Sequence, residues 1–251
     1  MLEKQKYIDK LLSWPPPLYD EEFPLIFFWR PKGGCTSLIK WYFYQIGLLQ
    51  TALDYDPWVH LYREEQFYRQ KDYKENVRKE LLKGEKKVYK LVRNPYRRAV
   101  SSFLSMIGNE QIRESVFPGV NTGISFKQFL HQVKRLGVSG DKIDLHIAEQ
   151  YEEGEEYFID RYLKLEDFNE QIPLIEKQFN LAVSPLSEIT RSPHHMKQKM
   201  KETKEIHFSD VPITIKDLDN IPKYDQFYDE ETEHLVADLY AKDFKRFGYA
   251  K

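Results

Sequence analysis

The sequence of 251 residues contains a single cysteine, Cys35, so it forms no intrachain disulfide, which fits a reducing compartment. No stretch approaches the 18 apolar residues that indicate a transmembrane helix. The first ten residues are charged and lack the apolar region of a signal peptide. These absences favour a cytoplasmic protein with no membrane span.

Neither sign of charge dominates. Thirty-eight basic residues face 40 acidic ones, for a net charge of −2. Such a balance creates no overall field that recruits nucleic acid or a membrane surface. We therefore expect no nucleic-acid partner, and any binding of anions must come from local groups of residues.

No internal repeat, low-complexity tract or clear linker divides the chain. Its length fits one α/β domain with a sizeable core. We expect a single domain over residues 1–251, in which residues 1–22 form a helical and proline-rich extension.

Three short apolar runs in the first half are predicted to be strands of a parallel sheet, at residues 23–29, 58–62 and 87–92. Each is followed by a predicted helix, over residues 36–49, 64–83 and 95–107. Gly84 ends the second helix and Pro95 begins the third. This alternation predicts a P-loop-like, three-layer α/β domain with a central, mainly parallel sheet flanked by helices.

The second half is less regular. Further helices are predicted over residues 125–135, 166–179 and 230–247, with Ser125 as the cap of the first. A further strand is predicted at residues 157–161, and residues 184–225 are expected to be rich in loops.

Residues 31–37, Pro-Lys-Gly-Gly-Cys-Thr-Ser, follow the first predicted strand; we call them the glycine loop. Glycines let a backbone approach an anion closely, and Thr36 and Ser37 open a helix whose amino end favours negative charge. Lys32 adds a mobile positive charge. The loop therefore predicts binding of a phosphate or phosphosulfate. The triphosphate pattern Gly-x4-Gly-Lys-Ser/Thr is absent, which disfavours an ordinary ATPase or GTPase.

Residues 93–101, Arg-Asn-Pro-Tyr-Arg-Arg-Ala-Val-Ser, follow another predicted strand. Arg93 at the strand end suits two oxygens of a phosphate, and Ser101 lies about two turns into the next helix. Together the two segments predict one ligand with two phosphate-type ends.

These segments resemble the two nucleotide-binding motifs of the sulfotransferase superfamily, Pro-Lys-x-Gly-x-Thr-Ser and Arg-Asp/Asn-Pro-x-x-Arg-x-Val-Ser. Residues 160–168 and 240–249 are similar to patterns of its carbohydrate-type, family 2-like branch. The resemblance runs from about residue 24 to residue 250. One departure is Gly33, which stands where the family often has a hydroxyl side chain.

The resemblance implies an enzyme that transfers a sulfuryl group from 3'-phosphoadenosine-5'-phosphosulfate (PAPS) to a hydroxyl of a carbohydrate or related small acceptor. The product nucleotide would be 3',5'-adenosine bisphosphate, and no metal would be needed. Lys32 would stabilise the leaving phosphate, and Arg93 and Ser101 would hold the 3'-phosphate. The 5' end would be held by the rest of the glycine loop, namely Gly33, Gly34, Cys35, Thr36 and Ser37.

The acceptor hydroxyl also needs a general base. His60 is the first candidate, because it is predicted at a strand end and such ends line the ligand crevice of parallel sheets. His146 is the second, since residues 144–150 are similar to a His-x-x-x-Gln stretch of carbohydrate-type relatives. Glu64 and Glu65 are weaker candidates.

Two other functions stay open. A small-molecule kinase with a similar loop would need ATP, Mg²⁺ and a carboxylate, for which Asp54 and Asp56 are the nearby candidates. A non-catalytic nucleotide-binding protein would fit better if His60 faced away from the glycine loop. The basic run at residues 191–199 is interpreted first as a solvated loop and second as a cover over the nucleotide.

Overall fold

The computed structural model describes residues 2–13, 15–190, 200–201 and 207–251. The chain groups into two compact units, the first comprising Met1–Val92 with Glu152–Ser192 and the second Arg93–Tyr151 with Pro193–Lys251. Each unit has its own cluster of buried apolar side chains. A single domain over residues 1–251 stays a prediction.

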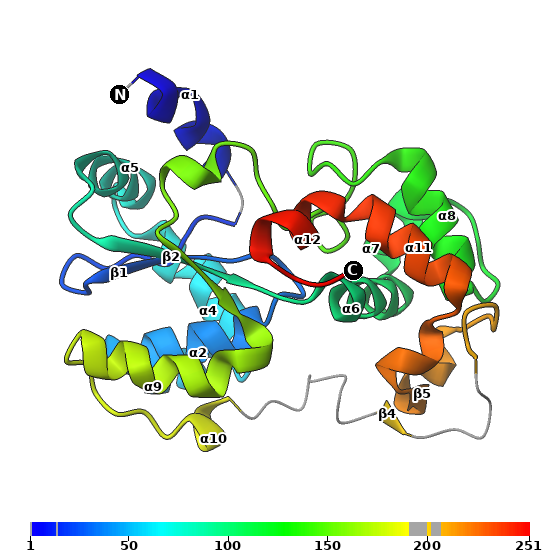
Figure 1. Cartoon of the computed structure of the whole chain (residues 1–251). Coiled ribbons are helices and arrows are strands. Elements are labelled where there is room, and N and C mark those ends of the chain that lie inside the picture. The colour runs from blue at the N-terminus through cyan, green and yellow to red at the C-terminus, as the bar shows by residue number, and fades with distance from the viewer. Residues whose placement is uncertain (1, 14, 191–199, 202–206) are drawn as a thin grey trace. The chain divides into compact units, whose positions relative to one another are not determined.

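The first unit is built on a three-stranded parallel sheet in the order β1-β2-β3. The strands are β1 (Leu25–Phe28), β2 (Lys87–Val92) and β3 (Arg161–Lys164). In Figure 1, α1 (Leu2–Leu11) and α5 (Tyr73–Lys83) lie on one side of this sheet, and α2 (Cys35–Gln45) and α9 (Phe168–Gln178) on the other. The expected class, a parallel sheet flanked by helices, is confirmed.

The predicted strand at residues 58–62 is wrong, because residues 59–62 form the start of α4 (Val59–Glu65), with Trp58 as its N-cap. The run was too short for its apolar pattern to distinguish a strand from a buried helix turn. Val59 and Arg63, four residues apart, are both buried, as on one face of a helix. Asp56 accepts a hydrogen bond from the Trp58 amide just before the helix, at 2.6 Å.

Several predicted boundaries also move. The helix expected to begin at residue 36 ends at Gln45, and α3 (Leu49–Tyr55) follows it. The helix expected over residues 64–83 is confined to α5, which does end at Gly84. The strand expected at residues 157–161 begins only at Arg161, after a 3₁₀ turn.

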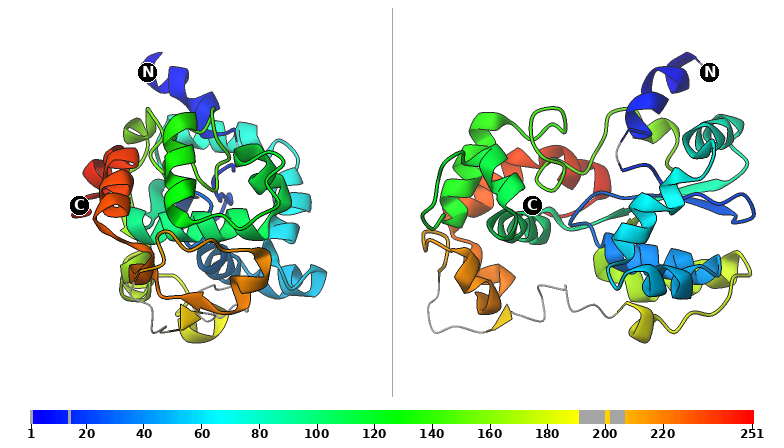
Figure 2. Two further views of the ribbon diagram at one scale, coloured as in Figure 1. Left: turned by 90° about the vertical axis from the view of Figure 1, so that its right-hand side faces the viewer. Right: turned by 180° about the vertical axis from the view of Figure 1, so that it is seen from behind.

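The second unit is mainly helical. It contains α6 (Pro95–Gly108), α7 (Glu110–Val116), α8 (Phe126–Leu136), α11 (Glu230–Leu239) and α12 (Ala241–Phe247). Helix α6 contacts α7, α8 and α11, and α8 packs beside α11 (Figure 2). Ser125 caps α8 with a reciprocal capping box, as expected. The single helix expected over residues 230–247 breaks at Tyr240.

The remaining elements are short. Helix α10 covers Leu186–Ile189, and a two-stranded parallel sheet pairs β4 (Met200–Lys201) with β5 (Ile221–Pro222). The 3₁₀ turns lie at Phe67–Arg69, Glu155–Tyr157, Leu165–Asp167, Ile215–Asp219 and Tyr224–Phe227. Within the described part of the chain, no helix has the length and apolar character needed to cross a bilayer.

Candidate functional site

The glycine loop makes a tight turn between β1 and α2. Lys32 has a φ of 66° and Gly34 a φ of 93°, both in the left-handed region. A lysine there is uncommon, and such backbone strain gathers at functional turns. A Cβ added to Gly34 would press on the side chain of Leu165, so both the positive φ and the packing favour glycine at this position.

Helix α2 begins directly after this turn, with Gly34 at its N-cap. Glycine has no side chain with which to cap the first amides, and the first-turn amides of a helix have no partner within the helix. Thr36 and Ser37 lie in that turn. The amino end of α2 therefore offers backbone donors, two hydroxyls and a positive dipole end to an anion.

His60 reaches the glycine loop from helix α4. Its Nε2 lies 3.0 Å from Thr36 Oγ1 and 3.7 Å from Cys35 Sγ. The predicted juxtaposition of His60 with the loop is therefore present, although a helix rather than a strand end provides it. Desolvation raises the pKa of the Cys35 thiol, against the opposing charges of Arg63 and Lys32. Cys35 is thus held as a neutral thiol, which fits packing better than nucleophilic chemistry.

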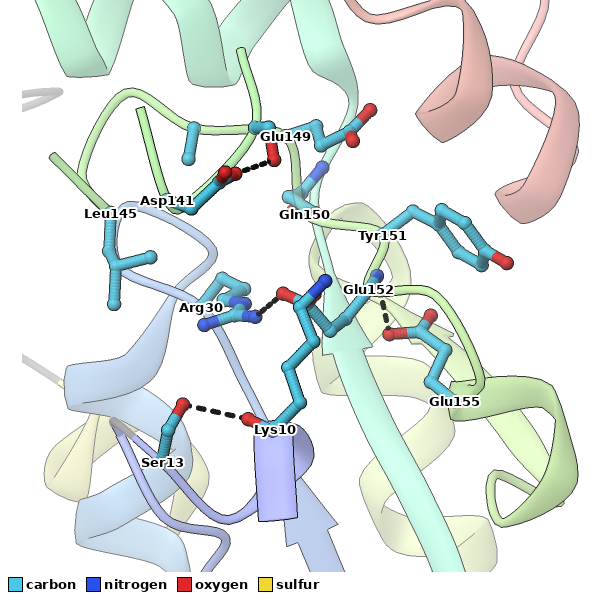
Figure 3. A network of polar contacts seen from close by, with 12 residues as sticks. Lys10, Ser13, Arg30, Asp141, Leu145, Glu149, Gln150, Tyr151, Glu152 and Glu155 are labelled. Atoms are coloured by element: carbon cyan, nitrogen blue, oxygen red, sulfur yellow. Dashed lines mark hydrogen bonds and ion pairs between the residues drawn. The ribbon is translucent and has the colours of Figure 1, made fainter. Parts of the chain in front are cut away.

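Arg30, the residue just before the glycine loop, is held by an ion pair. It donates a hydrogen bond to Glu152, whose other carboxylate oxygen pairs with Lys10 (Figure 3). The Glu152 amide in turn donates to Glu155 Oε2 at 3.0 Å, and Glu155 forms a buried ion pair with Lys90 of β2. A chain of charge-assisted contacts thus ties the loop to residues 152–155 and to the sheet.

In the second unit, the backbone of Arg93 is held by a buried amide. Gln150 accepts from the Arg93 amide at 2.9 Å and donates to the Arg93 carbonyl at 2.8 Å. The fully buried carboxylate of Asp243 accepts from the amides of Gln150 and Tyr151 at 2.8–3.0 Å. The C-terminal pattern at residues 240–249, which contains Asp243, therefore helps to fix the backbone around Arg93 through Gln150.

The side chain of Arg93 is oriented by Tyr224. Its Nη2 donates to the Tyr224 hydroxyl at 2.9 Å, and its guanidinium carbon lies 5.3 Å from the centroid of the Tyr224 ring. Sequence reasoning did not identify Tyr224, Gln150 or Asp243 individually. Two signals were available: the His-x-x-x-Gln stretch, whose glutamine is Gln150, and the C-terminal pattern at residues 240–249, which contains Asp243.

Helix α6 carries the rest of the Arg93 motif. Asn94 caps it by accepting from the amides of Tyr96 and Arg97, and Ser101 is buried in its second turn. Arg98, which matches the second arginine of the family pattern, is buried and donates to the carbonyls of Ala148 and Leu145 at 2.6 and 3.1 Å. Arg98 therefore fixes the loop at residues 145–148. These contacts account for the burial of Arg98 without a role in binding a ligand.

That loop presents His146 beside a carboxylate. His146 Nδ1 lies 2.8 Å from Asp144 Oδ1, and both side chains are partly exposed. The hydrogen bond with His146 lowers the pKa of Asp144. Because the ionised carboxylate accepts the Nδ1 proton, the imidazole lone pair is left on Nε2. Ser102 of α6 further fixes His146 by donating to its backbone carbonyl at 2.5 Å.

A family model described as the sulfotransferase family matches residues 19–250. The chain belongs to the sulfotransferase family. Its match to the family 2-like branch spans both the glycine loop and the Arg93 motif. No curated protein and no solved structure matches the chain.

The other candidate residues of this sulfotransferase have local partners. Asp54 accepts from Gln50 at 2.7 Å, and Asp56 accepts the Trp58 amide described above. Glu64 pairs with Arg63, and Glu65 accepts from the Tyr55 hydroxyl. No group of three or more potential metal ligands is found among the residues that the structure describes. The basic run at residues 191–199 lies outside them.

Proposed function

We propose that this sulfotransferase uses PAPS as donor and sulfates a hydroxyl group of a carbohydrate or related small acceptor. The family match over residues 19–250, which contains both nucleotide motifs, is the observation that carries this proposal. In the reaction the acceptor oxygen bonds to sulfur, the bond from sulfur to the bridging phosphate oxygen breaks, and the hydroxyl proton goes to a base. Such a transfer asks the protein mainly to position charges and stabilise them.

The glycine loop would hold the 5' end of the donor. Its backbone amides from Gly33 to Ser37 and the hydroxyls of Thr36 and Ser37 are the donors that a phosphosulfate requires. Lys32 would stabilise negative charge on the departing phosphate. The left-handed backbone at Lys32 and Gly34 supports this role, because it supplies the tight turn before the first amides of α2.

Arg93 and Ser101 would hold the 3'-phosphate. The guanidinium of Arg93 offers paired donors, and its backbone and side chain are both fixed by neighbours before any ligand arrives. Such preorganisation lowers the entropy lost on binding.

We propose His146, with Asp144 as its orienting partner, as the base. Asp144 engages Nδ1 and so leaves a lone pair at Nε2, which is the arrangement that a proton acceptor needs. His60, the first candidate from the sequence, is less suited to this role, because its Nδ1 accepts from Arg63, which can only donate.

Calorimetric titration tests the nucleotide assignment. We expect 3',5'-adenosine bisphosphate to bind equally well with and without EDTA, and to bind at least tenfold more tightly than ATP. Binding of ATP that requires Mg²⁺ would favour a kinase instead. Turnover of PAPS with a panel of sugar acceptors then distinguishes an enzyme from a non-catalytic nucleotide-binding protein, which would bind the bisphosphate and show no turnover.

A further inference from the structure

Arg63 is an almost fully buried cation behind the glycine loop, with 2% of its side chain exposed. It lies one turn after His60 on α4, so the two side chains share a face of that helix. Its guanidinium lies 4.6 Å from the centroid of the Trp29 ring and 5.4 Å from that of Tyr68. It also pairs with Glu64. Arg63 is therefore held in one orientation by two aromatic faces and one carboxylate.

The contact of Arg63 with His60 determines which imidazole nitrogen carries the proton. Arg63 Nη1 contacts His60 Nδ1. A guanidinium has donors and no acceptor, so Nδ1 must accept, and the imidazole proton is on Nε2. That Nε2 lies 3.0 Å from Thr36 Oγ1, so His60 donates to the threonine oxygen.

We propose that Arg63 and His60 are positioning residues that orient the Thr36 hydroxyl toward the 5' end of the nucleotide. Because the Thr36 oxygen accepts from His60, the threonine is left to donate its own proton to an anion at the amino end of α2. Both imidazole nitrogens are then engaged, so His60 is not the general base. This inference rests on the proposed function, since it assigns the nucleotide to this loop.

The tautomer is measurable directly in the wild-type protein. Long-range ¹H–¹⁵N correlation spectra of ¹⁵N-histidine-labelled protein at pH 7.5 distinguish the two neutral tautomers. The His60 signals, assigned by their loss in His60→Gln, are expected to show the proton on Nε2. A neutral ring protonated at Nδ1, or a doubly protonated ring, would overturn the proposal. The tautomer itself is read in the wild-type protein, and the variant serves only to assign the signals.

Kinetics separate a positioning role from a base. A glutamine at position 60 keeps an N–H donor but is not basic, whereas alanine has neither property. We expect His60→Gln to lower kcat by less than tenfold. His60→Ala should raise the dissociation constant of 3',5'-adenosine bisphosphate roughly three- to tenfold, as loss of one hydrogen bond predicts. A loss of a hundredfold or more in kcat for His60→Gln, the scale expected of a missing base, would contradict the proposal.

Arg63→Met tests the role of Arg63, because methionine retains an apolar stem of similar length and lacks the donor to His60 Nδ1. We expect the same weakening of bisphosphate binding as in His60→Ala, and no further weakening when the two substitutions are combined. Independent, multiplying losses would show that Arg63 does not act through His60. Failure of the wild-type protein to bind the bisphosphate would instead refute the proposed function, while the tautomer would still report on the Arg63–His60 contact.

Discussion

At the scale of single residues, the functional groups of this sulfotransferase depend on neighbours that contact no ligand in the proposed site. Arg93 is fixed by Gln150 and, through Gln150, by Asp243. Sequence motifs identified the residues that would touch the nucleotide, because their chemistry and spacing are distinctive. They did not assign Gln150 and Asp243 to this role, although both lie in stretches similar to family patterns, because the partner of a buried side chain can lie far along the chain.

Asp243 is expected to contribute strongly to stability. Replacing it with alanine would leave the buried amide of Gln150 and the part-buried amide of Tyr151 without their acceptor, at about 1–3 kcal/mol for each unsatisfied group. Urea unfolding should therefore show Asp243→Ala destabilised by about 2–4 kcal/mol. The adjacent Lys242→Ala, on an exposed side chain, should stay within about 0.5 kcal/mol of wild type. Equal stability of the two variants would refute this role.

A side chain at position 34 is expected to destabilise the glycine loop. Alanine at a left-handed φ costs about 1–2 kcal/mol, and its Cβ would also press against Leu165. Gly34→Ala should lower the thermal midpoint and weaken binding of 3',5'-adenosine bisphosphate. Gly47→Ala is the control, because that glycine shares the positive φ and has no atom within 4 Å of the added Cβ. Similar binding losses in both variants would contradict a specific role for Gly34.

At the scale of elements, strands and helices with strong local signals were predicted well. The strand at Lys87–Val92, the helix that begins at Pro95 and the cap at Ser125 were all predicted from the sequence. The error at residues 58–62 arose because five apolar and aromatic residues fit either a strand or a helix turn. Only tertiary packing, which buries Val59 and Arg63 together, selects the helix.

Asp229, the N-cap of α11, is expected to stabilise the fold in a way that is lost at low pH. Although desolvation acts to raise it, hydrogen bonds from Thr232, Ser209 and Lys127 hold the pKa of Asp229 below its ordinary value of 3.8. A depressed pKa means that the native state favours the carboxylate, so this contribution is present above pH 3.8 and is lost as the pH falls below it.

Chemical denaturation at pH 7 and at a pH below 3.8 measures this contribution of Asp229 to the free energy of unfolding. At pH 7, Asp229→Ala should lose about 1–2 kcal/mol of unfolding free energy, as for other N-caps. Below about pH 3.8 the difference from wild type should shrink. A difference for Asp229→Ala that stays constant down to pH 2.5 would contradict the assignment.

At the scale of the whole molecule, the family could be inferred from the sequence because two specific motifs occur in the right order, and the family match over residues 19–250 confirms it. The acceptor could not be inferred, since its binding residues would come from irregular loops that carry no periodic signal. The proposed function requires that the glycine loop and the Arg93 motif bind the 5' and 3' ends of one nucleotide.

A cycle of ligands and variants tests that claim most directly. Calorimetry would compare 3',5'-adenosine bisphosphate with 5'-AMP, which lacks the 3'-phosphate, on wild type, Lys32→Ala and Arg93→Ala. We predict that Arg93→Ala weakens the bisphosphate roughly 10- to 100-fold and leaves 5'-AMP unchanged, while Lys32→Ala weakens both ligands. Equal weakening of both ligands by Arg93→Ala, or of neither, would contradict the claim.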